Sequence, residues 1–215
     1  MSELLTDAHK YIELAERADV EPLRQFLFNE PERPLIAMGH GGSHSSAAYA
    51  ALLYGTNCGL GRAITPYQAN SLSDATLKSA KLFYYEPNEP VNRNFLRAVA
   101  ASDIVKFSNE KHPDVSFTEG FTDKLFIQTL NEKGLRFKLR ADGWITIPPE
   151  HNPHAVDGEG AGDWTTSAFI NEMGHHHMLT FDRIHLPNAW HCLQEAQRVA
   201  SESVSYIGAK GLIHH

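Results

Sequence analysis

An alternation of short apolar runs with amphipathic stretches and small-residue turns constrains the fold of this 215-residue chain more than any other feature. Apolar runs of strand length are each followed by a stretch with helical spacing, which is typical of a mostly parallel α/β sheet flanked by helices. The sequence therefore predicts a Rossmann-like three-layer arrangement. Strands are expected at residues 34–39, 60–65, 80–85, 104–107 and 125–130.

Helices and one hairpin complete the expected pattern. Asp142-Gly143 is a strong turn signal between two short segments, 136–140 and 144–148, and predicts a β-hairpin. Gly174 is expected to end a helix, with the histidine run that follows in a solvated loop. The expected helices cover residues 3–17, 21–28, 43–54, 68–79, 93–101, 118–124, 163–173 and 187–207.

Charge and cysteine content narrow the class of protein. The net charge is −7 and no basic run occurs, which argues against nucleic acid and anionic membranes as partners. The two cysteines form no metal or redox motif, no metal-type histidine spacing occurs, and no apolar stretch reaches the roughly 18 residues of a membrane span. A reduced, cytoplasmic setting is the expectation.

A Gly-Ala-Gly-Asp run at residues 160–163 precedes a helical pattern and carries the strongest chemical signal. The backbone N–H groups of Gly160, Ala161 and Gly162 can point at an anion, and the helix that follows adds the positive end of its dipole. Asp163 can then act as a general base toward a hydroxyl that faces the same anion. The alternative is a glycine-rich turn in which Asp163 only caps the helix.

A second glycine turn follows the first expected strand. Gly41, Ser43 and Ser45 lie where backbone N–H groups and hydroxyls could bind a phosphate. The alternative is a strand–helix turn that merely requires small residues.

From about residue 83 onward the chain resembles the PfkB (ribokinase-like) carbohydrate kinases. Residues 157–163 lie over the family signature Asp-Thr-Thr-Gly-Ala-Gly-Asp, and Asp-x-Asn-like and Asn-Glu segments precede it in the family's order. The resemblance implies a ribokinase-like fold for this half, with Mg²⁺ and ATP as cofactors. It also implies phosphoryl transfer to a sugar or related small alcohol, with Asp163 as the base and the preceding glycines holding the transferring phosphate.

The same resemblance assigns the nucleotide side of the site. Thr129 and Gly134 would line it, and Asn131 replaces the usual glycine, which requires the tolerance of asparagine for left-handed φ. Asn109 belongs to an Asn-x-x-Glu-like motif that influences Mg²⁺ and phosphate, although His112 stands at its final position.

Glu159 stands where the family has threonine. A carboxylate there either ligates Mg²⁺, directly or through water, or weakens nucleotide binding by repelling the phosphates. The residue pattern leaves both alternatives open.

Residues 21–85 resemble the first half of a SIS (sugar isomerase) domain, a phosphosugar-binding module. The resemblance implies that Gly41, Ser43 and Ser45 contact a sugar phosphate, but the module's second hydroxyl-rich turn is absent. The sequence thus favours a division into residues 1–82 and 83–215, or one continuous α/β unit.

Three functions follow from these patterns. The first is an ATP-dependent sugar kinase, and the alternative is a phosphosugar-binding module without catalysis. The third is a recombined remnant that pairs with a partner chain or forms a homo-oligomer through apolar strand edges.

Overall fold

The computed structural model describes residues 82–87, 90–178, 180–208 and 212, together with the strands at 35–38 and 61–64. Its main feature is a five-stranded sheet in the order β3-β4-β5-β6-β7. The first three strands are parallel, and the last two form antiparallel pairs. The strands are β3 (Tyr84–Tyr85), β4 (Ile104–Ser108), β5 (Leu125–Thr129), β6 (Leu135–Leu139) and β7 (Ile145–Ile147).

Two further strands form a separate parallel pair. They are β1 (Leu35–Met38) and β2 (Gly61–Ile64), with Leu35 opposite Gly61. Both occur where the sequence predicts strands. The four helices expected before residue 80 lie outside the described residues, and the division near residue 82 stays a prediction.

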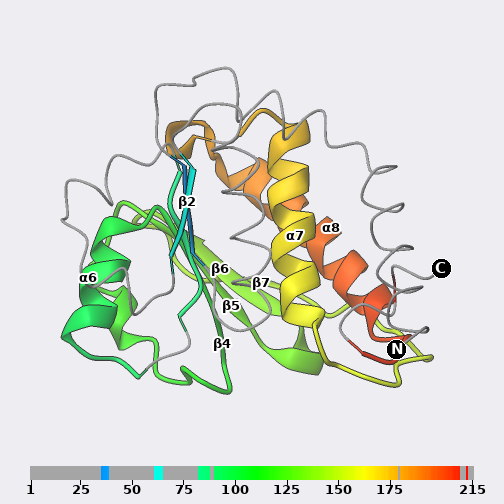
Figure 1. Cartoon of the computed structure of the whole chain (residues 1–215). Coiled ribbons are helices and arrows are strands. Elements are labelled where there is room, and N and C mark those ends of the chain that lie inside the picture. The colour runs from blue at the N-terminus through cyan, green and yellow to red at the C-terminus, as the bar shows by residue number, and fades with distance from the viewer. Residues whose placement is uncertain are drawn as a thin grey trace.

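Helices cover both faces of the five-stranded sheet, as the three-layer prediction requires. Figure 1 shows α6 on one side of the sheet and the adjacent helices α7 and α8 on the other. Among the described residues, no helix combines the length and apolarity needed to cross a membrane. The helices are α6 (Arg93–Ala101), α7 (Ala161–His175) and α8 (Leu186–Ser203), with short 3₁₀ turns η1 (Ser116–Thr118), η2 (Asn131–Lys133) and η3 (Phe181–Arg183).

Successive side chains of the central strands enter two different cores. In β4, Ile104 packs with α7 and α8, whereas the next residue, Val105, packs with α6. Leu125 and Phe126 of β5 divide in the same way. Because both faces are covered, these strands are continuous apolar runs rather than alternating ones, as the sequence pattern indicated.

The helix predicted at residues 118–124 is wrong. Only the turn η1 forms, and the segment then leads directly into β5. Polar groups of this segment form hydrogen bonds with other elements. The Thr118 carbonyl accepts a hydrogen bond from Lys138 Nζ of β6 at 2.9 Å. Lys124 Nζ donates to the carbonyls of Ala100 and Ser102, at 3.0 and 2.7 Å, and thereby caps the end of α6.

The prediction that Gly174 ends a helix is also wrong, because α7 continues through His175. His176 is the C-cap and His177 adopts a left-handed φ of 55°. The N–H of Met178 then donates to the Met173 carbonyl at 2.8 Å, which closes the helix as a Schellman motif. The left-handed position that usually takes glycine is held here by a histidine.

The predicted hairpin is confirmed as β6 and β7, but its left-handed residue is Arg140, with a φ of 56°. The Arg140 guanidinium donates to the carbonyls of Ile184 and Phe181 and lies over the Phe181 ring. These contacts stabilise Arg140 in a left-handed backbone conformation that residues other than glycine rarely adopt.

Gly134 lies where two backbone segments approach each other closely. Its φ is +89°, and an added Cβ would stand 2.4 Å from the Ile147 carbonyl oxygen and 2.8 Å from the Pro149 nitrogen. We therefore expect Gly134→Ala to lower the free energy of unfolding by about 2–4 kcal/mol, through backbone strain and overpacking. Urea denaturation measures the change. Gly143→Ala is the matched control, since a Cβ there meets nothing within 4 Å, and equal losses in both variants would refute the explanation.

Candidate functional site

The first turn of α7 has the conformation expected of an anion-binding helix end. Gly160 is its N-cap, with a left-handed φ of 80° and no side chain to cap the turn. The first N–H groups of an α-helix have no acceptor within the helix, and the helix dipole makes this end electropositive. Residues 160–163 therefore form the start of a helix, and their binding of a phosphate stays a prediction.

The loop that leads into this turn is fixed by backbone hydrogen bonds. The N–H groups of Val156 and Asp157 both donate to the Val204 carbonyl, at 2.7 and 3.1 Å. The Asp157 carboxylate in turn accepts from the N–H groups of Glu159 and Gly208, at 2.9 and 2.8 Å. Its two oxygens thus hold the loop, while the Glu159 side chain is exposed.

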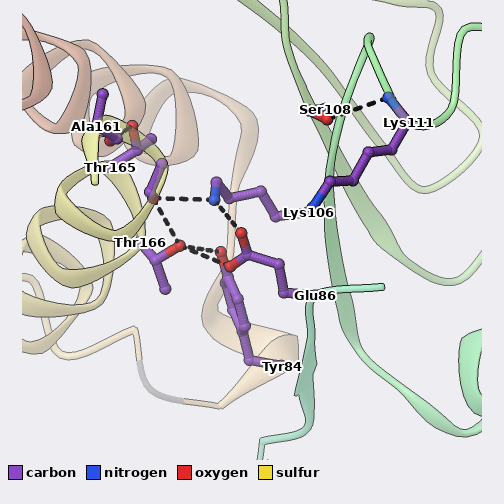
Figure 2. Close-up of polar contacts among 9 residues, drawn as sticks. Tyr84, Glu86, Lys106, Ser108, Lys111, Ala161, Thr165 and Thr166 are labelled. Carbon is purple, nitrogen blue, oxygen red and sulfur yellow. Dashed lines mark hydrogen bonds and ion pairs between the residues drawn. The ribbon is translucent and has the colours of Figure 1, made fainter. Parts of the chain in front are cut away.

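Lys106 connects the sheet to the first turn of α7. Its ammonium lies 2.6 Å from Glu86 Oε1 and donates to the Gly162 carbonyl at 2.9 Å (Figure 2). The residue is only 2% exposed. β4 is an interior strand, and Lys106 faces the same side as Ile104, toward α7.

Thr166 and Tyr84 extend this interaction into a polar chain across the site (Figure 2). Thr166 Oγ1 donates to Glu86 Oε2 at 3.0 Å and lies 3.1 Å from the Tyr84 hydroxyl. Burial, followed by the charge of Glu86, raises the pKa of Tyr84 well above its ordinary value, so the phenol keeps its proton. Thr166 Oγ1 also lies 3.2 Å from the Gly162 carbonyl oxygen, which ties the chain back to the first turn of α7.

Asp163 lies in the first turn of α7, with its side chain exposed to solvent. Its charge is the smallest of the contributions that raise the pKa of Tyr84. The role of this carboxylate as a general base stays a prediction.

The residues predicted for the nucleotide side gather beyond β4 and β5. The N–H of Asn109 donates to the Thr129 carbonyl at 2.9 Å, and Asn131 Nδ2 donates to Glu110 Oε1 at 2.9 Å. Asn131 has a φ of 55°, which confirms that this turn needs a residue that tolerates the left-handed region. Ligands of open parallel sheets bind beyond the carboxyl ends of the strands, where these residues lie.

Two positions of the kinase-like pattern have structural explanations. Gly134 is buried, and the close approach of the segment after β7 accounts for the glycine. His112 is 4% exposed, and its ring contacts those of Phe95, Phe107 and Phe117. It therefore belongs to the aromatic core rather than to a cation site.

The sequence did not predict the polar chain that joins the sheet to α7. It also predicted a second phosphate-binding turn that lies outside the described residues. The sequence pattern assigned no site role to Glu86, Tyr84 or Thr166 and did not predict the ion pair between Lys106 and Glu86. A lysine at a core-facing position of an apolar strand was the available signal for a buried ion pair. Gly41, Ser43 and Ser45 lie outside the described residues.

Comparison with known proteins identifies the fold. No protein-family model matches the sequence, and no curated protein matches it. Among solved structures, fructokinase from Vibrio cholerae O395, with fructose, ADP and calcium bound, superposes with a TM-score of 0.52 at 16% identity. Ribokinase from Giardia lamblia superposes with a TM-score of 0.53 at 15% identity.

These superpositions cover 83% and 87% of this chain, but only 56% and 59% of the two kinases. The chain therefore has a ribokinase-like fold and spans less than two thirds of the length of these enzymes. At this level of identity the likeness concerns the fold, while the chemistry must be argued from the residues.

We expect Lys106→Met to loosen the contact between β4 and α7. The change removes the ammonium that Glu86 and the Gly162 carbonyl share, and we expect the free energy of unfolding to fall by about 1–3 kcal/mol. Chemical denaturation measures this loss. Lys133→Met is the control, because Lys133 is exposed in η2, and a loss as large in the control would contradict the role of Lys106.

The loop before α7 should loosen in acid. Hydrogen bonds from the N–H groups of Glu159 and Gly208 lower the pKa of Asp157 in the fold. Its contribution is therefore complete above the unfolded pKa of about 3.9 and is lost as pH falls through the lower folded value. Hydrogen exchange at the Gly208 amide should accelerate there relative to other amides, and Asp157→Asn should abolish that extra acceleration. An unchanged profile in the variant would refute this assignment.

Proposed function

We propose that the chain carries out ATP-dependent phosphoryl transfer to a sugar or a related small alcohol. The observation that carries the proposal is the start of α7, where a left-handed Gly160 opens the helix and Asp163 is exposed in its first turn. The ribokinase-like fold supports it, because the V. cholerae fructokinase was solved with fructose and ADP bound.

The residues present can perform the chemistry that such a transfer needs. Asp163 would accept the proton of the acceptor hydroxyl as the hydroxyl oxygen forms a bond to the terminal phosphorus, and the bond from that phosphorus to the ADP oxygen breaks. The N–H groups of Gly160 and Gly162 would stabilise the charge on the transferring group. The N–H of Ala161 donates to the Gly158 carbonyl at 3.3 Å, so it would have to exchange that acceptor for the phosphate. Lys106 adds a buried positive charge behind this turn, partly balanced by Glu86.

Two groups of residues are proposed to bind cofactors, one beyond β4 and β5 and one in the loop before α7. Thr129, Asn131 and Asn109 would hold the nucleotide, because they lie together beyond β4 and β5. The buried Gly134 would contribute only by allowing the turn between β5 and β6. Mg²⁺ would neutralise phosphate charge when bound. The exposed carboxylate of Glu159, in the loop that Asp157 holds, is a hard oxygen donor of the kind that this ion prefers.

Isothermal titration with ATP in the presence of Mg²⁺ and turnover measurements test the proposal together. We expect the unmutated chain to bind ATP, and Asp163→Asn to lower transfer to the acceptor sugar by about 10²- to 10⁴-fold because the base is lost. ATP affinity should change little, since Asp163 acts on the acceptor. The substitution is at an exposed position and should leave the far-ultraviolet circular dichroism unchanged.

The control is Asp142→Asn, an exposed carboxylate in the turn of the β6–β7 hairpin. It should keep both binding and turnover. Transfer that survives in Asp163→Asn would eliminate Asp163 as the base, and absence of ATP binding at millimolar concentration would contradict the proposed function as a whole.

A further inference from the structure

Three side chains with metal-ligating atoms meet at the far end of α7. Glu172 and His176 lie one helical turn apart, and His191 extends from α8. One ligand atom from each side chain lies within 4.8 Å of the other two. Among the described residues, this is the one group of three or more metal-ligating side chains that lie this close together. Glu172 Oε2 is 4.0 Å from His176 Nε2, and the rings of His176 and His191 are 5.4 Å apart between centroids.

The two helices that carry these side chains are packed firmly against each other. Met173, next to Glu172, and Cys192, next to His191, are both buried in the core cluster shared by α7 and α8. The Schellman turn fixes His176 as the C-cap. The backbone positions of all three side chains are therefore set by the core, while their outer ends remain accessible to solvent.

We propose that Glu172, His176 and His191 bind a divalent transition-metal ion of the zinc type. Two imidazoles and one carboxylate suit Zn²⁺ and its neighbours, whereas Mg²⁺ and Ca²⁺ prefer sites made entirely of oxygen. A tetrahedral ion with bonds of about 2.0–2.1 Å needs its ligand atoms roughly 3.3 Å apart. Small rotations of the outer side-chain atoms bring the observed separations to that value, and water fills the fourth position.

The position of the site on α7 favours a cation and separates it from the proposed reaction. The carboxyl end of a helix is electronegative, so the end of α7 attracts a positive ion. Asp163 and His176 are separated by roughly 20 Å at about 1.5 Å per residue. The bound ion links the end of α7 to α8, and the inference does not depend on the proposed kinase activity.

Titration of the full chain with Zn²⁺ tests the proposal. We expect one site of micromolar or tighter affinity, and a melting temperature about 5–11 °C higher when free Zn²⁺ exceeds the dissociation constant about 100-fold. Titration with Co²⁺ should give the visible absorption of a tetrahedral ion with nitrogen and oxygen ligands. His191→Ala and Glu172→Gln should each weaken binding at least about tenfold.

Other histidines provide the matched controls. His175 and His185 are exposed near the same helix ends but do not belong to the cluster, so His175→Ala and His185→Ala should retain the affinity and the Co²⁺ spectrum. All four substitutions replace side chains that are not in the core, and circular dichroism checks their folding. Equal weakening in the control variants, or Zn²⁺ binding that survives in His191→Ala, would overturn the proposal.

Discussion

The buried ammonium of Lys106 is the interaction on which the arrangement of the site depends. Removing a charge from water costs several kcal/mol unless it is paired and hydrogen-bonded. Glu86 and the Gly162 carbonyl provide that compensation, at 2.6 and 2.9 Å. The partners come from the end of β3 and the first turn of α7, so the electrostatic requirement of one strand residue fixes where that helix begins.

The same strand divides the molecule into two cores with different character. The face toward α6 is rich in aromatic rings, whereas the face toward α7 and α8 is built mainly from aliphatic side chains. Lys106 is a charged residue on the aliphatic face, and it stands where the sheet meets the candidate site. The structure thus places a buried charge next to the feature that carries the proposed chemistry.

Local patterns predicted most of the described elements because their causes are local. The bounds of α6 were anticipated, and β4, β5 and the β6–β7 hairpin lie within a residue or two of the expected segments. The segment at 118–124 was misread because its carbonyls and its lysine are used by distant elements, which no local pattern reveals. The helix end near Gly174 was misread because a histidine takes the left-handed position.

The candidate site was predictable to a similar degree. The start of α7 was anticipated because glycines followed by an acid and helical spacing are a local signal. Thr166 and His191 were not, because their roles depend on where one helix lies relative to a strand or to another helix. Such distances are set by packing of the core and leave no trace in residue spacing.

The hydrogen bonds between the loop before α7 and the segment after α8 constrain the order in which the chain can fold. The Val204 carbonyl and the Gly208 N–H hold the loop that precedes α7, although Gly208 lies 51 residues after Asp157 in the chain. A ribosome releases these residues long after the loop itself. The turn before α7 can therefore reach its final geometry only when synthesis has passed Gly208.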